Sequence, residues 1–131
     1  MARRWLIDAM NVIGSRPDKW WNDPDKAMWS LAVSLDEYAG ITGDEVTVVF
    51  DRPPKPAPDV ATARLAYAAR RGRNAADHEI VEMIARDSDP SSLRVVTSDK
   101  ALRDRVTELG ARLMSSGAFR DRVDRTLAAE Q

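Results

Sequence analysis

The residues best suited to chemistry are four aspartates placed where secondary-structure elements begin or end. Three of them follow apolar, β-branched runs that predict strands, and the fourth opens a predicted helix: Asp8, Asp51, Asp99 and Asp77. The carboxyl ends of parallel strands share one edge of a sheet, so these side chains can meet there. Crowded carboxylates repel each other unless a cation lies between them. Because oxygen ligands favour Mg²⁺ or Mn²⁺, we predict that these four acids hold such an ion.

An acidic metal site of this kind supports phosphodiester hydrolysis without a protein nucleophile. The ion lowers the pKa of a bound water and stabilises the charge of an in-line displacement. The chain has no cysteine and one histidine, which excludes a thiolate nucleophile and any mechanism that needs two imidazoles. Asn11 and Ser98 lie close in sequence to two of the aspartates, and either could orient a water molecule or a phosphate oxygen.

Each of these polar residues also has a purely structural interpretation. Asp99 could cap the helix that follows it, and Asp77 could favour the helix dipole. For Asp51, a role in starting a turn is the more common meaning. Asn11 could form a turn after the strand, and Ser98 could act as a cap. Asp8 is the hardest to explain in this way, because an acid that closes an all-apolar strand is costly unless it is paired or ligated.

Basic and aromatic side chains provide candidate RNA contacts. The densest positive segment could hold a phosphate backbone, although a solvated basic surface is the usual meaning of such a run; it comprises Arg64, Arg70, Arg71 and Arg73. Trp20 and Trp21 could stack on unpaired bases, but packing over the edge of a core is more common for such a pair. His78 is interpreted as a solvated helix residue.

Strands and helices alternate along the chain, which predicts right-handed crossovers and a mostly parallel sheet. We expect strands at 5–8, 46–50, 64–68, 93–97 and 111–114, and helices at 24–39, from 74, from 99 to 110, and at 118–129. Gly40 and Gly110 are expected to end helices, and Asn74 with Asp77 resembles a capping box. The proline-rich segment 52–59 is expected to be a rigid loop that could cover the rim of the sheet.

The composition is that of an ordinary globular protein with one domain over residues 1–131. The 131 residues carry a formal charge of −1, which excludes a strongly basic nucleic-acid binder of the histone kind. No apolar run is long enough for a transmembrane helix, and the N-terminus lacks the apolar core of a signal peptide. A cytoplasmic protein without membrane contact is therefore expected.

Four segments together resemble the YacP-like type of the NYN-domain family, which belongs with the PIN-like nucleases. They follow the family's order and spacing: Ile7-Asp8-Ala9-Met10-Asn11-Val12-Ile13-Gly14, Val48-Val49-Phe50-Asp51, Ala76-Asp77-His78-Glu79-Ile80, and Val95-Val96-Thr97-Ser98-Asp99. Many relatives carry a second acid directly after the helix aspartate, where this chain has His78. That departure leaves open whether one metal or two would bind, and how active the site is.

The resemblance implies a PIN-like three-layer α/β/α fold with a central, mostly parallel sheet, and Mg²⁺- or Mn²⁺-dependent cleavage of RNA. Asp8, Asp77 and Asp99 would be the acidic ligands, with Asn11 and Ser98 beside them, and Asp51 would be an accessory acid. Our main hypothesis is therefore an endoribonuclease acting on single-stranded RNA, with ribosome-associated mRNA as one candidate substrate.

Two alternative hypotheses remain. The first is a PIN-like module that binds RNA or the ribosome through a weak or inactive site. The second is a phospho-acceptor receiver domain with Asp51 as the acceptor. Receivers, however, carry paired acids at the end of the first strand, where this chain has Ala9 and Met10 after Asp8.

Overall fold

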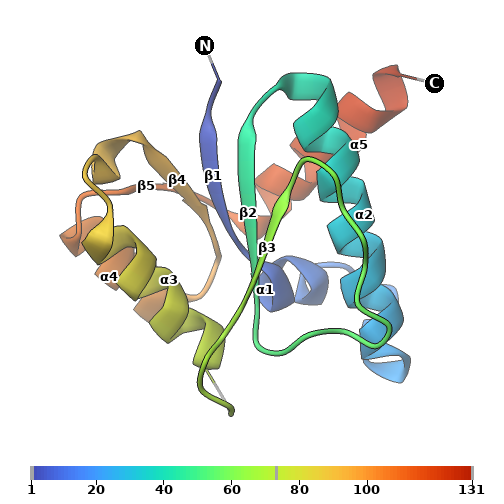
Figure 1. The fold of residues 1–131 in the computed structure, drawn as a ribbon, viewed down its shortest axis with the longest axis horizontal. Helices are drawn as coiled ribbons and strands as arrows, with labels where there is room; N and C mark the ends of the chain where they lie inside the picture. Colours follow the sequence, from blue (N-terminus) through green and yellow to red (C-terminus); the bar gives the residue numbers. More distant parts are fainter. Residues whose placement is uncertain (1, 73, 131) are drawn as a thin grey trace.

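The structure, a computed structural model, describes residues 2–72 and 74–130 and is built on a central sheet of five parallel strands. Their order is β3-β2-β1-β4-β5 (Figure 1). The strands are β1 (Arg4–Asp8), β2 (Glu45–Phe50), β3 (Arg64–Tyr67), β4 (Leu93–Val96) and β5 (Arg112–Met114). Because every pairing is parallel, all strands start at one edge of the sheet and end at the other. We call these the amino edge and the carboxyl edge.

Helices cover both faces of this sheet (Figure 1). One layer contains α1 (Ala9–Gly14), α2 (Pro24–Thr42) and α5 (Ser116–Ala129), and the other contains α3 (Ala75–Arg86) and α4 (Lys100–Glu108). Two short 3₁₀ turns, η1 (Trp20–Asn22) and η2 (Pro90–Ser92), complete the elements. The expected three-layer α/β/α fold is therefore confirmed. Among the described helices, none combines the length and the apolar content needed to cross a bilayer.

The strand order creates a switch point beside β1. From β1 the chain moves outward through β2 and β3, and then returns to the other side of β1 to add β4 and β5. Where neighbouring crossovers leave a sheet in opposite directions, a crevice opens at the carboxyl ends of the strands, and ligands of open α/β sheets bind there. Asp8 ends β1 at this point.

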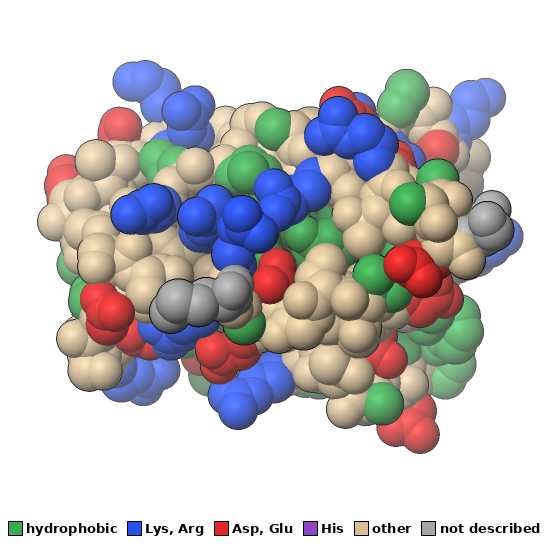
Figure 2. Space-filling model, turned by 90° about the horizontal axis from the view of Figure 1, so that it is seen from above, with side chains coloured by type: hydrophobic (Ala, Val, Ile, Leu, Met, Phe, Trp, Pro, Cys, Tyr) green, Lys and Arg blue, Asp and Glu red, His purple; other side chains and the backbone are tan. Residues whose placement is uncertain are grey.

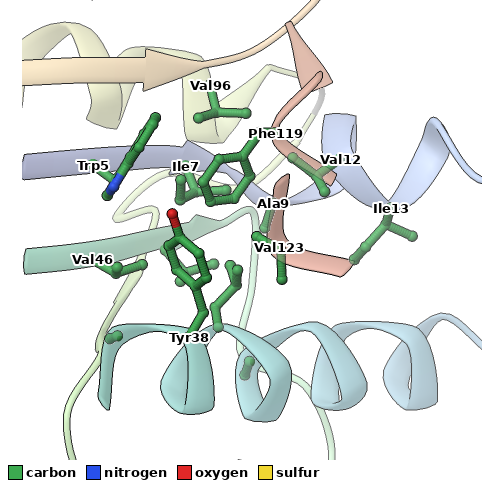
Figure 3. Close-up of a cluster of buried hydrophobic side chains, with 14 of the residues drawn as sticks. Trp5, Ile7, Ala9, Val12, Ile13, Tyr38, Val46, Val96, Phe119 and Val123 are labelled. Carbon is green, nitrogen blue, oxygen red and sulfur yellow. The ribbon is translucent and has the colours of Figure 1, made fainter. Parts of the chain in front are cut away.

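The alternation of side chains along β1 builds a core on each face of the sheet. Trp5 and Ile7 point into the layer of α1, α2 and α5, whereas Leu6 packs against α3 and α4. Figure 3 shows Trp5 and Phe119 side by side, with Tyr38 rising from α2 towards them. The ring centroids of Trp5 and Phe119 are 5.0 Å apart, and those of Tyr38 and Phe119 are 5.8 Å apart, edge to face. Such aromatic pairs add to the stabilisation from burial alone.

The end of α2 differs from its prediction. The helix continues past Gly40 to Thr42, and Gly43 adopts the left-handed conformation with φ 74° and donates its N–H to the carbonyl of Ala39. Both glycines could take this conformation, and the helix ends at the later one because Ile41 and Thr42 still fit the helical backbone. Gly110, with φ 88°, lies just past α4 as expected.

The start of α3 also differs from its prediction. Asn74 has φ 65°, and its side chain makes no capping hydrogen bond. An N-cap residue needs an extended backbone to turn its side chain onto the helix, so a left-handed Asn74 cannot fill that role. Asp51 acts instead, because its Oδ1 accepts the N–H of Ala76 at 3.1 Å. A carboxylate at the end of β2 thus satisfies the first turn of α3.

Two segments between the predicted elements have more structure than the sequence suggested. The residues after Asp8 form α1 directly, and Val12 and Ile13 bury its inner face. The proline-rich loop after β2 runs along α2 (Figure 1) and is tied to it, because Asp36 accepts the N–H groups of Ala61, Thr62 and Ala63. The proline-rich segment itself is held beside the start of α2, where Asp25 Oδ1 accepts hydrogen bonds from the Arg52 guanidinium and the Lys55 N–H at 2.6 and 3.0 Å. That residues 52–59 cover the rim of the sheet stays a prediction.

Candidate active site

The four predicted aspartates all lie at the carboxyl edge. Asp8 is the last residue of β1, Asp51 follows β2 directly, Asp77 lies in the first turn of α3, and Asp99 is the residue before α4. Asp51 and Asp77 are close enough to Asp8 to raise its pKa, and Asp51 and Asp99 do the same to Asp77. We call these four residues the acidic site.

Asp8 is the buried member of the acidic site, with only 5% of its surface exposed. Burial raises its pKa to about 7, and the nearby charges of Asp77 and Asp51 contribute to this shift. The Thr97 hydroxyl opposes it by donating a hydrogen bond to Asp8 Oδ2 at 2.9 Å. A carboxylate with so little hydration or counter-charge favours a cation nearby, as expected of a metal ligand.

Asp77 is half-buried, and its carboxylate accepts no hydrogen bond from the residues that the structure describes. Burial raises its pKa first, followed by the charges of Asp99 and Asp51, while His78 acts in the opposite direction. Among the residues that the structure describes, none occupies either oxygen of Asp77. Asp77 also lies in the first turn of α3, where a carboxylate interacts favourably with the helix dipole. This structural role is compatible with binding a ligand.

Asp51 and Asp99 each use one carboxylate oxygen to hold a helix. Asp99 Oδ1 accepts the N–H of Leu102 at 2.9 Å, so the expected cap of α4 is present. Asp51 Oδ1 holds the first turn of α3 in the same way. In both residues Oδ2 has no hydrogen-bond partner within the described chain. The caps fix where these two carboxylates sit and leave one oxygen of each for another contact.

Thr97 is a functional candidate that the sequence analysis missed. Its side chain is fully buried, and its hydroxyl donates to Asp8 while accepting the N–H of Asp99 at 3.2 Å. One hydroxyl thereby fixes the relative positions of β1 and the start of α4. In the sequence, Thr97 simply continues the β-branched run of Val95 and Val96, so its hydroxyl carried no signal of this role.

Asn11 joins three elements beside the acidic site. Its Oδ1 accepts the N–H of Ser98 at 2.8 Å and the hydroxyl of Ser116 at 2.6 Å. Because a backbone N–H can only donate, these bonds fix which end of the amide is the oxygen. The NH₂ group of Asn11 then has no partner in the described part of the chain and can donate to an anion.

Ser116, a second residue missed by the sequence analysis, is fully buried at the start of α5. Besides its bond to Asn11, its N–H donates to the Ser98 hydroxyl oxygen at 3.0 Å. The Ser98 side chain is exposed and keeps its own hydroxyl proton for a ligand. Asn11, Ser98 and Ser116 thus form a small network that holds one donor from Asn11 and one from Ser98 near the acidic site.

The structure separates the four candidate RNA-binding arginines. Arg70 and Arg71 are exposed in the segment between β3 and α3, at the carboxyl edge. Arg64 begins β3 at the amino edge and lies 4.0 Å from Glu45 in an ion pair. Arg73 falls outside the described residues. By position, Arg70 and Arg71 accompany the acidic site and Arg64 does not.

The tryptophan pair lies on a different surface. Trp20 packs at the edge of the core, as favoured from the sequence, and Trp21 is 59% exposed with its ring 6.2 Å from that of Trp20. A cavity of about 720 Å³ opens here, lined by residues of α1, η1, α2 and α5. None of the four aspartates lines this cavity, so the cavity is separate from the acidic site.

The acidic site fits a divalent cation in its donors but is not a closed metal cage. Within residues 2–72 and 74–130, no three acidic or histidine side chains are gathered tightly enough to surround an ion. Mg²⁺ is commonly held by one or two carboxylates together with water and substrate phosphates, which requires no such cage. The oxygen donors and the raised pKa values of Asp8 and Asp77 match that mode of binding.

Comparison with known proteins places the chain in a family. The model of the YacP-like NYN domain matches residues 5–131. The crystal structure of Rae1 (YacP) from Bacillus subtilis has 21% identity and a TM-score of 0.80, over 96% of this chain and 76% of that one. A single-residue mutant of the same protein gives 23% identity and a TM-score of 0.78, over 97% of this chain and 78% of that one. No curated protein matches. The chain belongs to the YacP-like NYN domain family.

Proposed function

We propose that this protein is a Mg²⁺- or Mn²⁺-dependent endoribonuclease that hydrolyses phosphodiester bonds at the acidic site. The observation that carries the proposal is Asp8, a buried carboxylate at the switch point of the sheet with two further carboxylates close by. Membership of a nuclease-type family supports the same reaction class.

In this proposal Asp8, Asp77 and Asp99 would hold the ion, and Asp51 would either support these ligands or lie near the metal-bound water. The bound ion supplies an activated water and stabilises charge on the phosphate. Thr97 keeps the Asp8 carboxylate in one orientation, and the cap bond to Leu102 does the same for Asp99. Groups that orient metal ligands in this way contribute to affinity and rate although they do not touch the metal.

The neutral donors of the site would position the RNA. The NH₂ group of Asn11 and the hydroxyl proton of Ser98 can each donate to a phosphate oxygen, because their acceptor atoms are already occupied inside the protein. Arg70 and Arg71 would contact the backbone on either side of the cleaved bond. Such contacts read phosphate and not sequence, so they specify no cleavage motif.

Cleavage of a labelled single-stranded RNA in Mg²⁺ or Mn²⁺ tests the proposal. We expect Asp8→Asn and Asp99→Asn each to lower the rate by roughly 100-fold or more, since each removes a charged ligand. Asp104→Asn, the same change at an exposed position of α4, is the matched control and should leave the rate within about 2-fold of wild type. Unchanged cleavage in both site variants would overturn the acidic-site mechanism.

A second candidate function is RNA binding without turnover. It is favoured by the open arrangement of the acids, which form no metal cage in the described residues, and by His78 at the position where many relatives carry an acid. This alternative predicts RNA affinity that survives EDTA, together with no cleavage in either metal. The family match argues against the receiver-domain alternative.

A further inference from the structure

Three arginines lie close together on the side of the sheet that faces α5, two of them over the Trp5 ring and the third in the neighbouring position of the same row. Strand register places Trp5 of β1, Arg94 of β4 and Arg112 of β5 side by side in one row across the sheet. Neighbours in a parallel row project to the same face, and Arg122 reaches the same place from α5. We call Arg94, Arg112 and Arg122 the arginine cluster.

The members of this cluster are held in place by specific contacts. The guanidinium carbons of Arg94 and Arg122 lie 5.7 and 5.4 Å from the centre of the Trp5 ring. Arg122 Nε also donates to the Tyr38 hydroxyl at 2.9 Å, and Arg112 Nε donates to the carbonyl of Ser91 at 3.2 Å. These contacts use a ring-facing side, one N–H or both, and the remaining N–H groups have no partner among the residues that the structure describes.

No carboxylate neutralises the cluster within the described residues. Other arginines of the protein do have acidic partners there, such as Arg4 with Asp87 and Arg16 with Asp124. Like charges on neighbouring strands destabilise a sheet, so adjacent Arg94 and Arg112 carry a cost that no acid offsets. Figure 2 looks onto the amino edge and shows several basic side chains close together there, although the whole chain carries a charge of −1.

We propose that the arginine cluster binds phosphate groups of an RNA backbone. Guanidinium groups recognise phosphate through paired hydrogen bonds, and positions fixed in advance reduce the entropy lost on binding. The inference rests on the proposed function in one respect, namely that the ligand is RNA. The cluster adds a second contact surface, at the edge of the sheet opposite to the acidic site.

The edge strand β5 connects the two surfaces. It begins at Arg112 and leads into Ser116, which bonds to Asn11 and Ser98 beside the acidic site. Three strand residues span about 10 Å. An RNA strand lying along β5 therefore reaches both surfaces.

A purely structural role for the arginines makes a different prediction. If Arg94 and Arg122 only shield Trp5, which is 1% exposed, their loss would lower thermal stability and leave RNA affinity unchanged. Arg112 is exposed and has no recorded contact with Trp5, so its substitution separates the two roles.

The test is RNA binding in EDTA, measured by fluorescence anisotropy with a labelled 12-nucleotide single strand at several salt concentrations. We expect Arg112→Gln to weaken binding roughly 5-fold and to reduce the slope of log Kd against log salt by about 1, with a larger loss when Arg94→Gln is added. Arg103→Gln, an equal change of charge at an exposed position of α4, is the matched control and should alter neither quantity.

Equal affinity in wild type, Arg112→Gln and the double variant would overturn the inference, as would failure of the wild type to bind RNA. A fall in melting temperature without a fall in affinity would assign the cluster to structure alone and overturn it too. Because EDTA removes any metal, the result does not depend on cleavage. Weakened binding by the arginine variants together with undiminished cleavage by Asp8→Asn would support this inference and overturn the acidic-site mechanism.

Discussion

The two edges of the sheet treat the same residue type in opposite ways. At the carboxyl edge, burial raises the pKa of Asp8, and no cation of the described chain pairs with it. At the amino edge, hydrogen bonding to Arg4 lowers the pKa of Asp87, and two parallel bonds join the guanidinium to both carboxylate oxygens at 3.2 and 2.6 Å. Charge that is paired inside the protein serves stability, whereas charge left unpaired is available to a ligand.

Among the substitutions that test this difference between the two edges, Asp8→Asn should have the largest effect on stability. At pH 8 and without metal, Asp8 is mostly ionised in the folded wild-type protein, which must therefore bury a charge. Asparagine has the same shape and removes this charge, and its side-chain oxygen can still accept the hydrogen bond from Thr97. We expect Asp8→Asn to increase the free energy of unfolding by roughly 2–3 kcal/mol in EDTA. Chemical denaturation in EDTA measures this free energy of unfolding, and Asp104→Asn is the control. A less stable Asp8→Asn protein would mean that the Asp8 charge is already compensated.

Thr97→Val removes the hydroxyl that joins Asp8 to the N–H of Asp99. The shape of the side chain is kept, but two buried polar groups lose their partner, so we expect a loss of roughly 1–2 kcal/mol in the free energy of unfolding. Cleavage of RNA should fall by roughly 10- to 100-fold, because the orientation of Asp8 is released. Thr107→Val, on the exposed part of α4, controls for the substitution itself. Equal cleavage by both variants would remove Thr97 from the site.

Asp87→Asn tests the paired edge. A carboxylate whose pKa is lowered in the folded state contributes stability above its unfolded pKa, and that contribution is lost as the pH falls through the folded value. We expect the variant to be less stable than wild type by about 1 kcal/mol at pH 7. The difference should begin to shrink below about pH 4, where Asp87 of the unfolded wild type becomes protonated, and should vanish below the lowered pKa of the folded state. Thermal melts of both proteins from pH 7 to pH 3 measure this difference in stability. A difference that stays constant with pH would contradict the ion-pair explanation.

Asn74→Gly should have the smallest effect. The side chain makes no capping bond, and glycine accommodates φ 65° without strain, so the free energy of unfolding should change by less than about 0.5 kcal/mol. Replacing a cap residue with glycine costs only a few tenths of a kcal/mol, so a loss of about 1 kcal/mol would show that the Asn74 side chain stabilises the start of α3 through a contact other than a cap. Thermal unfolding of wild type and Asn74→Gly at pH 7 makes the comparison.

Much of the fold followed from local patterns in the sequence. The β-branched run that ends in Phe50 predicted β2, and the weaker run from Arg64 predicted β3; both strands are present. Asp99 and Gly110 were predicted at the two ends of α4 because a cap bond reaches only three residues and a left-handed glycine acts on its own turn. Signals of this kind need no knowledge of the rest of the chain.

The chemistry of the carboxyl edge depends on contacts that no local pattern encodes. Thr97 bonds to Asp8 across 89 residues, and Ser116 bonds to Asn11 across 105. Their sequence neighbours are consistent with an ordinary strand end and an ordinary helix start. The cap of α3 was predicted incorrectly for the same reason, because its acceptor comes from β2 and not from the preceding residue.

The sequence by itself determined most of the segments that become strands and helices, α1 excepted, and that acids stand at their ends, because both depend on short-range periodicity and backbone preference. Only the tertiary structure decided which charges are paired. Strand order and register placed Arg94 beside Arg112, and the length of β3 put Arg64 at the opposite edge from Arg70. Electrostatic partners are set by distance in space, and that distance is fixed only once the sheet has formed.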